Sequence, residues 1–253
     1  MRACFPIQTA MPTDSHDAIY ANPLKEVGDF SFDEQVTRVF PDMIKRSVPG
    51  YEIILSHIGS LAQTFARPGG RCYDLGCSLG AATLSLRHRI PEDNTIIAVD
   101  NSAPMIARCQ TVIERDTAKP QVELRCEDIQ DVEIAQADVV LLNFTLQFIP
   151  VESRLALLEK ICQGLRAGGL LLLSEKIAFE SPDIQATMTE KHHQYKRDKG
   201  YSALEVSQKR TALERVLIPE SRSTHLTRLK AVGFSSVDTW FQYFNFAAFM
   251  AIK

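Results

Sequence analysis

The stretch from residue 71 to residue 87 constrains the fold most, because it passes from a short apolar strand through two glycines directly into a helical pattern. It reads RCYDLGCSLGAATLSLR, with Gly76 and Gly80 bracketing a tight turn. A dinucleotide fingerprint would read G-x-G-x-x-G and place a phosphate at the start of the helix. Here the pattern is D-x-G-x-S-x-G, and Asp74 would repel a phosphate. The turn therefore favours a ligand with positive charge, such as the ammonium and sulfonium groups of S-adenosylmethionine.

Alternating strand and helix patterns follow this turn, which is typical of a mostly parallel sheet with helices on both faces. The patterns predict strands at 95–99, 122–126, 137–142 and 170–174, and helices at 104–113 and 152–165. Ligands of open α/β sheets bind outside the carboxyl ends of the strands. We therefore expect the polar residues that end these strands to line one rim of the sheet: Asp74, Asp100, Asp128 and Asn143.

The flanking segments have different patterns. Apolar spacing predicts helices at 32–47, where Pro41 should kink or divide the run, and at 51–65, which together would form a lid over the site. Residues 1–28 are polar and contain prolines, so we expect a flexible tail before a single domain at 29–253. A polar helical insertion is expected at about 179–219, after the fifth strand.

Two last apolar runs, 236–243 and 246–252, are separated by very few residues. A parallel crossover needs about a dozen residues or more, so these runs predict an antiparallel pair that closes the sheet.

Charge and cysteine content exclude several classes of function. The net charge is -3, the pI is about 6.1 and the basic residues are scattered. The clustered positive charge typical of an RNA-binding protein is therefore missing. The six cysteines form no C-x-x-C pair, which indicates a reducing compartment. No segment approaches the ~18 consecutive apolar residues of a membrane span, and the start lacks the apolar core of a signal peptide. We expect a cytoplasmic protein with a small ligand.

Two of the rim acids suit a nucleoside. Asp100 lies 24 residues after Gly76, at the end of the next strand, where a carboxylate can accept both ribose hydroxyls. That position alone also fits NAD. Asp128 can accept from an adenine amino group while Ile129 packs on the ring. Both acids could equally be solvated strand ends, but a rim shared with Asp74 favours S-adenosylmethionine.

Six segments carry a more specific signal: YDLGCSLGAATLSL, AVDNSAPMI, VLLNFTLQF, LSEKI, GYSALEVSQKR and WFQYFNF. Together they resemble one bacterial family, the carboxy-S-adenosyl-L-methionine synthases, over nearly everything from Gly28 to Lys253. The resemblance implies a Rossmann-like class I methyltransferase fold with a seven-stranded sheet, and a homodimer. The implied reaction moves the carboxyl group of prephenate onto the S-methyl carbon of S-adenosylmethionine and leaves phenylpyruvate. The product, carboxy-S-adenosyl-L-methionine, would serve a separate enzyme that modifies the wobble uridine of tRNA, so this chain need not bind tRNA stably.

The resemblance also implies site residues, and it implies no metal. Arg210 would hold the new carboxylate, although by its sequence alone it fits a solvated helix face equally well. Cys77 would contribute its backbone rather than act as a nucleophile. His192, His193 and Tyr201 are weaker candidates for contact with the second substrate. The full set of implied contacts with S-adenosylmethionine is Tyr51, Gly76, Cys77, Ser78, Asp100, Asn101, Asp128, Ile129, Asn143 and Arg210.

Two other functions stay open at this stage. One is an ordinary methyltransferase that acts on a small carboxylate held by Arg210, and the other is a module that binds S-adenosylmethionine without turnover. The carboxyl transfer is chemically coherent because a sulfonium makes its methyl group acidic, and a dry site could let the carbon attack carbon dioxide before it escapes. The sequence contains no evident general base, which fits the family's proposal that prephenate itself helps to remove the proton.

Overall fold

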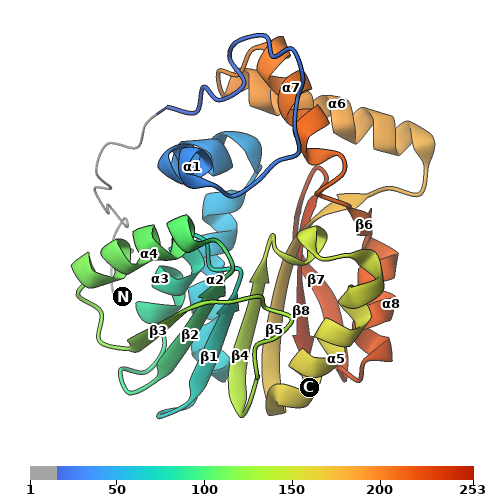
Figure 1. The fold of residues 1–253 in the computed structure, drawn as a ribbon. Helices are drawn as coiled ribbons and strands as arrows, with labels where there is room; N and C mark the ends of the chain where they lie inside the picture. Colours follow the sequence, from blue (N-terminus) through green and yellow to red (C-terminus); the bar gives the residue numbers. More distant parts are fainter. Residues whose placement is uncertain (1–15) are drawn as a thin grey trace, which may run out of the picture.

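The computed structural model describes residues 16–253, which form an α/β fold around one mixed sheet (Figure 1). The strands are β1 (Arg71–Leu75), β2 (Thr95–Asp100), β3 (Gln121–Cys126), β4 (Ala137–Asn143), β5 (Leu165–Ala178), β6 (Glu220–Ser221), β7 (Ser236–Tyr243) and β8 (Phe246–Ile252). Their order is β3-β2-β1-β4-β5-β8-β7, and the short β6 pairs with β5 outside this path. The first five strands of that order are parallel, whereas β8 runs antiparallel to both β5 and β7. The predicted sheet with a closing antiparallel pair is confirmed.

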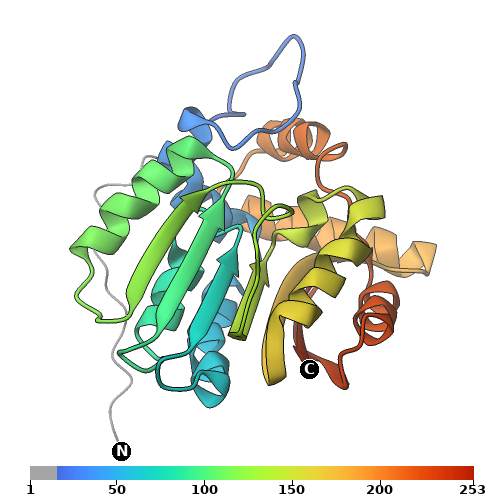
Figure 2. The same cartoon turned by 60° about the horizontal axis from the view of Figure 1, so that its bottom comes forward.

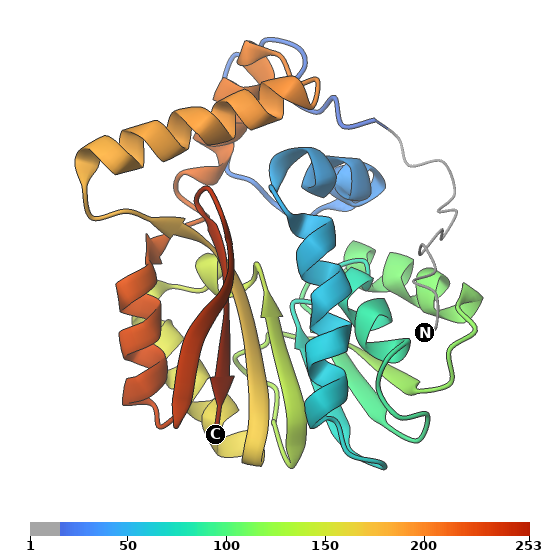
Figure 3. The ribbon, with the colours of Figure 1, turned by 180° about the vertical axis from the view of Figure 1, so that it is seen from behind.

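Helices cover both faces of the sheet and one of its ends. They are α1 (Glu34–Ser47), α2 (Tyr51–Phe65), α3 (Ala81–Arg87), α4 (Ala103–Arg115), α5 (Arg154–Gly164), α6 (Pro182–Asp198), α7 (Ala203–Leu213) and α8 (Arg222–Ala231). One face packs against α2, α3 and α4, and the other packs against α5 and α8, as Figures 2 and 3 show from two sides. Helices α1, α6 and α7 lie above the carboxyl ends of the parallel strands (Figure 1).

The centre of the sheet is apolar on both faces, as expected for parallel strands covered by helices. Residues 137–142 of β4 and 170–173 of β5 are almost inaccessible to solvent. This run of Val and Leu is why the sequence predicts buried strands there. The carboxyl ends of the strands are therefore held on a rigid layer.

Two local features differ from the sequence prediction. Pro41 does not divide the first helix, since α1 is continuous with Pro41 buried inside it, and the burial of Val39 and Met43 in the same turns stabilises the helix around the missing N–H group. Strand β5 begins at Leu165 rather than at residue 170. Its register with β4 shifts between Ala137 and Val139, so the early part, which includes the glycine pair, is an irregularity inside the strand rather than a helix end.

The tail expected at residues 1–28 falls only in part within the described chain. Residues 1–15 lie outside it, and residues 16–28 contain no helix or strand, yet they are attached to the domain. Asp17 is 1% exposed, and its carboxylate accepts hydrogen bonds from Tyr201 and Lys209. Gln208 donates to two backbone carbonyls of this segment and accepts from the backbone N–H of Leu24. Sequence composition missed these bonds because their partners lie more than 180 residues away.

A buried ion pair at Glu220 joins β6 to the helices of one face. Its carboxylate pairs with Arg154, which is fully buried at the start of α5, and with Arg228 of α8. Burial alone would raise the pKa of the Glu220 carboxyl, but hydrogen bonds and charge from Arg228 and Arg154 outweigh it and hold the pKa at about 2. This carboxylate therefore stabilises the fold above the ordinary pKa of Glu, and the stabilisation is lost as the pH falls toward 2.

We expect Glu220→Gln to lower the free energy of unfolding by about 3 kcal/mol at pH 7, because Arg154 would stay buried without its carboxylate. Urea unfolding measures the loss, which should hold down to about pH 4.5 and shrink below it. The control is Glu92→Gln, which breaks an exposed pair with Lys119 and should cost less than about 1 kcal/mol. Equal losses in the two variants would contradict a structural role for the buried pair.

Candidate functional site

The glycine turn after β1 is tied to the neighbouring strand. The backbone N–H groups of Gly76 and Cys77 both donate to the carbonyl of Val99, at 2.8 and 2.9 Å. Gly76 has φ +85°, and a Cβ atom there would lie 2.4 Å from the side chain of Thr145. Ser78 also has a positive φ, of 50°. Only glycine fits at position 76, and its lack of a Cβ atom lets the backbone of the turn pack closely against Thr145.

Asp100 fixes the turn from the end of β2. One carboxylate oxygen accepts from the backbone N–H of Ser78 at 2.9 Å, and the other accepts from that of Ser102 at 2.9 Å. Burial raises the pKa of the Asp100 carboxyl, while these two backbone hydrogen bonds lower it in part. Each carboxylate oxygen has further lone pairs, so this half-buried group can accept more hydrogen bonds from a ligand.

Asp74 lies beneath the turn rather than on an open rim, which differs from the expected position. It is 1% exposed, and one oxygen accepts from the Thr83 hydroxyl at 2.6 Å. The other oxygen has no hydrogen-bond partner among residues 16–253. Burial raises the pKa of the Asp74 carboxyl to about 6, and the Asp100 charge adds to the rise. A buried carboxylate oxygen without a partner is well suited to a cationic ligand.

Tyr51 approaches this carboxylate from the start of α2. Burial raises the pKa of the Tyr51 phenol, and the nearby Asp74 charge raises it further. The Tyr51 ring lies 6.3 Å from that of Phe144, which follows β4. The structure thus brings together Tyr51, Asp74 and Asp100, which are far apart in the sequence.

Asp128, Ile129 and Asn143 occupy the ends of the neighbouring strands. The carboxylate of Asp128 is half-exposed and accepts from the backbone N–H of Gln130 at 2.8 Å. Ile129 is buried in the core cluster on the α5 face. The amide oxygen of Asn143 is buried without a hydrogen-bond partner among the described residues, while Asn101 is exposed beside Asp100. These positions continue the rim that Asp100 begins.

Cys77 has the properties of a small packing residue. It is 4% exposed, and a hydrogen bond with Cys109, burial and the nearby carboxylates all raise the pKa of its thiol. A thiol that stays protonated is a poor nucleophile.

Arg210 lies in a second cavity, of about 220 Å³, between β5, α6 and α7. Burial lowers the pKa values of Lys176 and His193, and the charge of Arg210 adds to both shifts, so the three groups lie near one another. His192 is buried, and its Nε2 lies 2.8 Å from the Ser47 carbonyl. The residues that line the cavity are Lys176, His192, His193, Lys196, Arg210, Leu213, Glu214, Leu217 and Pro219.

Sequence reasoning missed the two lysines of this cavity and misplaced one candidate. Lys176 follows the apolar part of β5 within the LSEKI segment, and its position after a buried strand was the available signal. Lys196 sits in a polar helix where nothing marks it out. Tyr201 does not line the cavity, since its hydroxyl donates to Asp17 and its ring lies under Arg46.

A row of rings connects the rim to the second cavity. The ring of Tyr51 packs on that of Phe144. The ring centroid of Phe144 lies 6.0 Å from that of Phe246, and the ring centroid of Phe246 lies 4.9 Å from that of His192. Strand register gives the same result, because Asn143 pairs with Ser174 and Lys176 is two residues further along β5. The two sites are therefore neighbours at one end of the sheet.

Comparison with known proteins identifies the fold. Residues 73–169 match a family model described as a methyltransferase domain. An O-methyltransferase family protein from Burkholderia thailandensis superposes with a TM-score of 0.63 at 14% identity, over 90% of this chain and 65% of that one. Human N-acetylserotonin methyltransferase, solved in complex with SAM, gives a TM-score of 0.57 at 16% identity, over 87% of this chain and 55% of that one. These structures establish the fold.

Curated relatives are far more similar in sequence. The protein named carboxy-S-adenosyl-L-methionine synthase from Geobacter sp. (strain M21) is 58% identical over 95% of this chain and 100% of its own length. The protein of the same name from Vibrio campbellii is 51% identical over 96% of this chain and 99% of its own length. This chain belongs to the carboxy-S-adenosyl-L-methionine synthase family. The resemblance seen in the sequence is confirmed. In the part of the chain that the structure describes, no helix is both long and apolar enough to cross a membrane.

The buried carboxylate at Asp74 makes a testable contribution to stability. Its pKa is raised from 3.8 to about 6, so ionisation destabilises the folded state, and that effect grows as the pH rises through this range. We expect wild-type protein to lose up to about 3 kcal/mol relative to Asp74→Asn between pH 4 and pH 6. Urea unfolding of both proteins across this range measures the difference. Asp131→Asn, at an exposed acid, is the control. A stability difference between wild type and Asp74→Asn that does not change with pH would refute the assignment.

Proposed function

We propose that this protein converts S-adenosyl-L-methionine and prephenate into carboxy-S-adenosyl-L-methionine and phenylpyruvate. Identity of 51–58% to proteins named for this product, over about 95% of the chain, carries the proposal. The site geometry supports it, because a rim suited to a cationic nucleoside lies beside a cavity lined by cations that suits a carboxylate. We also propose a cytoplasmic homodimer whose product is used by a separate enzyme for the wobble uridine of tRNA, without stable tRNA binding by this chain.

The residues at the rim suit S-adenosylmethionine. Asp100 would accept the ribose hydroxyls with lone pairs that its two backbone bonds leave free, and Asn101 would lie beside the same ribose. Asp128 would accept from the adenine amino group, with Ile129 beneath the ring. The backbone of Gly76, Cys77 and Ser78 would border the methionine part of the ligand.

Two further groups suit the methionine end of this ligand. The unpartnered oxygen of Asp74 and the nearby phenol of Tyr51 would face its positive charge. The amide of Asn143, whose oxygen also has no partner among the described residues, would complete the set. A bound cation would favour the ionised form of Asp74 and offset its burial.

The reaction balances without a protein base. Prephenate loses carbon dioxide and its ring hydroxide, which leaves phenylpyruvate, and the hydroxide takes a proton from the S-methyl group to form water. The methyl carbon then forms a bond to carbon dioxide. The protein's part is to hold the two substrates together, keep water out and bind the new carboxylate. Arg210 would hold that carboxylate through two parallel charge-assisted hydrogen bonds.

Mass spectrometry of the nucleoside product tests the proposed function. Incubation with S-adenosylmethionine and prephenate should yield a nucleoside heavier by one carboxyl group, together with phenylpyruvate. S-adenosylhomocysteine would instead indicate a methyltransferase that acts on a small carboxylate. Unaltered S-adenosylmethionine would indicate a binding module without turnover.

Asp100→Ala should weaken S-adenosylmethionine binding by about 10- to 150-fold, because a charged acceptor of hydrogen bonds contributes about 1.5–3 kcal/mol. Calorimetric titration measures the affinity. Asp131→Asn serves as the control and should bind like wild type. Wild-type affinity in Asp100→Ala would contradict the ribose assignment.

Arg210→Ala should keep most of its affinity for S-adenosylmethionine but lose about 10-fold or more for the carboxylated product, since only the product carries the carboxylate that Arg210 binds. Arg210→Lys should restore part of the difference, because a point charge cannot replace the planar fork. Titration with both ligands gives the ratio of the two affinities. A ratio equal to that of wild type would mean that Arg210 is a surface residue.

A further inference from the structure

The second cavity contains cationic groups that the protein itself does not neutralise. Among residues 16–253, the charged ends of Lys176, Lys196 and Arg210 have no hydrogen bond or ion pair. Lys196 is only 6% exposed, and Lys176 is half-buried at the end of β5. Taking an ammonium group out of water without a partner costs several kcal/mol. A fold that keeps two such groups beside an arginine is organised to bind an anion.

The electrostatics agree with the geometry. Burial, followed by the charges of Lys209 and Lys176, holds the pKa of Lys196 well below its ordinary value, and Asp17 raises it only in part. Burial and the Arg210 charge lower the pKa of Lys176. Burial also lowers the pKa of His192 to about 2, and the charges of Lys196 and Lys176 add to the shift, so this ring is neutral near pH 7. Perturbed groups that converge in a cavity mark a functional site.

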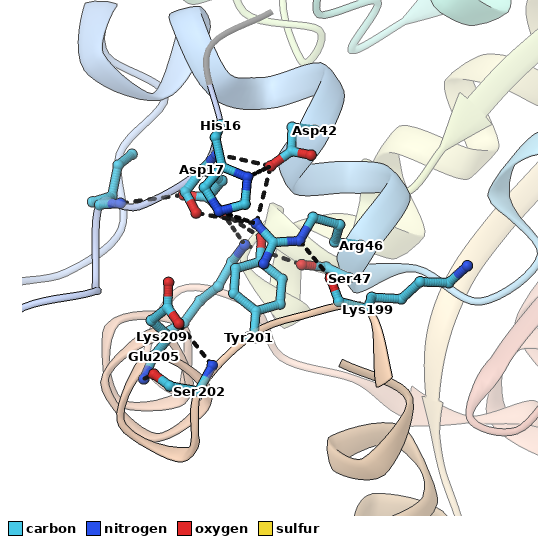
Figure 4. A network of polar contacts seen from close by, with 11 residues as sticks. His16, Asp17, Asp42, Arg46, Ser47, Lys199, Tyr201, Ser202, Glu205 and Lys209 are labelled. Carbon is cyan, nitrogen blue, oxygen red and sulfur yellow. Dashed lines mark hydrogen bonds and ion pairs between the residues drawn. The ribbon is translucent and has the colours of Figure 1, made fainter. Parts of the chain in front are cut away.

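A neighbouring lysine, unlike Lys196, pairs with a carboxylate of the described chain. Lys209, the residue before Arg210, lies 3.4 Å from the Asp17 carboxylate and 3.1 Å from the Ser47 hydroxyl (Figure 4). Arg46 donates to the Asp17 carbonyl and pairs with Asp42 in the same network. These contacts fix α7 against α1 and the segment before it, and thereby fix the turn of α7 that carries Arg210. Lys196 has no such counter-ion.

The shape of the cavity limits the ligand to a small molecule with an apolar part. Its volume is about 220 Å³, below the ~300–1,000 Å³ of pockets that hold drug-sized ligands. Leu213, Leu217 and Pro219 form an apolar part of the wall. The edge of the His192 ring packs on Phe246 nearby. Three cations beside these apolar groups suit a ring that bears two carboxylates better than a monocarboxylate or an inorganic ion.

We propose that this cavity binds the second substrate as a dianion, with Lys176 and Lys196 as the anchoring cations and Arg210 placed toward the carboxyl group that is transferred. The inference rests on the proposed function for the identity of the substrate, and it adds the residues that bind it. Lys176 is the link between the sites, because it lies two residues beyond the β5 partner of Asn143. Release of carbon dioxide here would occur next to the rim.

Calorimetric titration with two unreactive probes tests the anion site directly. The dicarboxylate 2-benzylsuccinate should bind wild-type protein at least 10-fold more tightly than the monocarboxylate 3-phenylpropanoate. Lys176→Met and Lys196→Met should each weaken dicarboxylate binding by 10-fold or more, with S-adenosylmethionine affinity within twofold of wild type. The control is Lys191→Met, at an exposed lysine of α6 outside the cavity, which should bind both probes like wild type.

Two further measurements separate an anion site from a structural role. Lys196→Met should be at least as stable as wild type in urea, because methionine fits a buried site without the penalty of an unpaired charge. Dicarboxylate binding should also raise the pKa of Lys196, because a bound dianion favours the charged form, so proton uptake accompanies binding at any pH where part of the free lysine is deprotonated. This uptake appears as a dependence of the binding enthalpy on the ionisation enthalpy of the buffer. The charged and titratable groups around Lys196 are Asp17, Lys176, His192, His193 and Lys209, with Arg210 and Glu214 in the lining of the same cavity.

The outcomes distinguish this inference from the proposed function. Unchanged dicarboxylate binding in both lysine variants would overturn the anion site. If prephenate yields carboxy-S-adenosyl-L-methionine with the same KM in wild type and in a Lys176→Met, Lys196→Met double variant, the proposed function stands and this inference fails. If the dicarboxylate binds through both lysines but prephenate yields no product, the proposed function fails and the anion site stands.

Discussion

The hydrogen bonds of one carboxylate, Asp100, organise the ligand-facing end of this fold. Its two oxygens accept from Ser78 in the glycine turn and from Ser102, the residue that caps α4. The end of β2 is thus joined to the loops that follow β1 and β2. The glycine turn can approach β2 this closely because Gly76 has no Cβ, and its N–H group donates to the Val99 carbonyl. The remaining lone pairs of Asp100 are therefore held in a fixed direction before any ligand binds, which reduces the ordering that binding requires.

Most of the fold could be predicted because its signals are local. The apolar runs of β4 and β5, the glycine turn and the short gap before Phe246 each specify one element or one pairing. The undivided helix around Pro41 and the early start of β5 at Leu165 were not predicted, because the packing there outweighs the local preference of proline and glycine. The attachment of the segment at Asp17 could not be predicted, since it depends on Tyr201 and Lys209, which approach it only in the folded chain. Backbone propensity contains no information about such distant partners.

The candidate site also contains both residues that local sequence signals predict and residues that they do not. Asp100, Asp128 and Asn143 lie at or just after the carboxyl ends of parallel strands, so the rule for parallel sheets predicts their common rim. Asp74 follows the same rule, but the turn folds over it, and burial with a raised pKa gives it a different electrostatic role from that of an exposed rim acid. Lys196 carries no sequence signal, because a lysine in a polar helix is usually solvated. Its burial results from the packing of α6 against α1 and α7 at the end of the sheet.

The two sites leave charges of opposite sign unpaired. They therefore suit ligands of opposite charge. Under the rim, one buried carboxylate oxygen of Asp74 has no hydrogen-bond partner among the described residues and can bind a cation. In the cavity, the ammonium groups of Lys176 and Lys196 have no partner among the same residues and can bind an anion. Each unpaired group destabilises the free protein, and each is neutralised by a ligand of the opposite charge. A sulfonium nucleoside and a dicarboxylate bound side by side would relieve both penalties. They would also attract each other across the row of rings from Tyr51 to His192. Binding of one substrate should therefore favour binding of the other, which brings the carboxyl donor and the methyl acceptor together before the reaction begins.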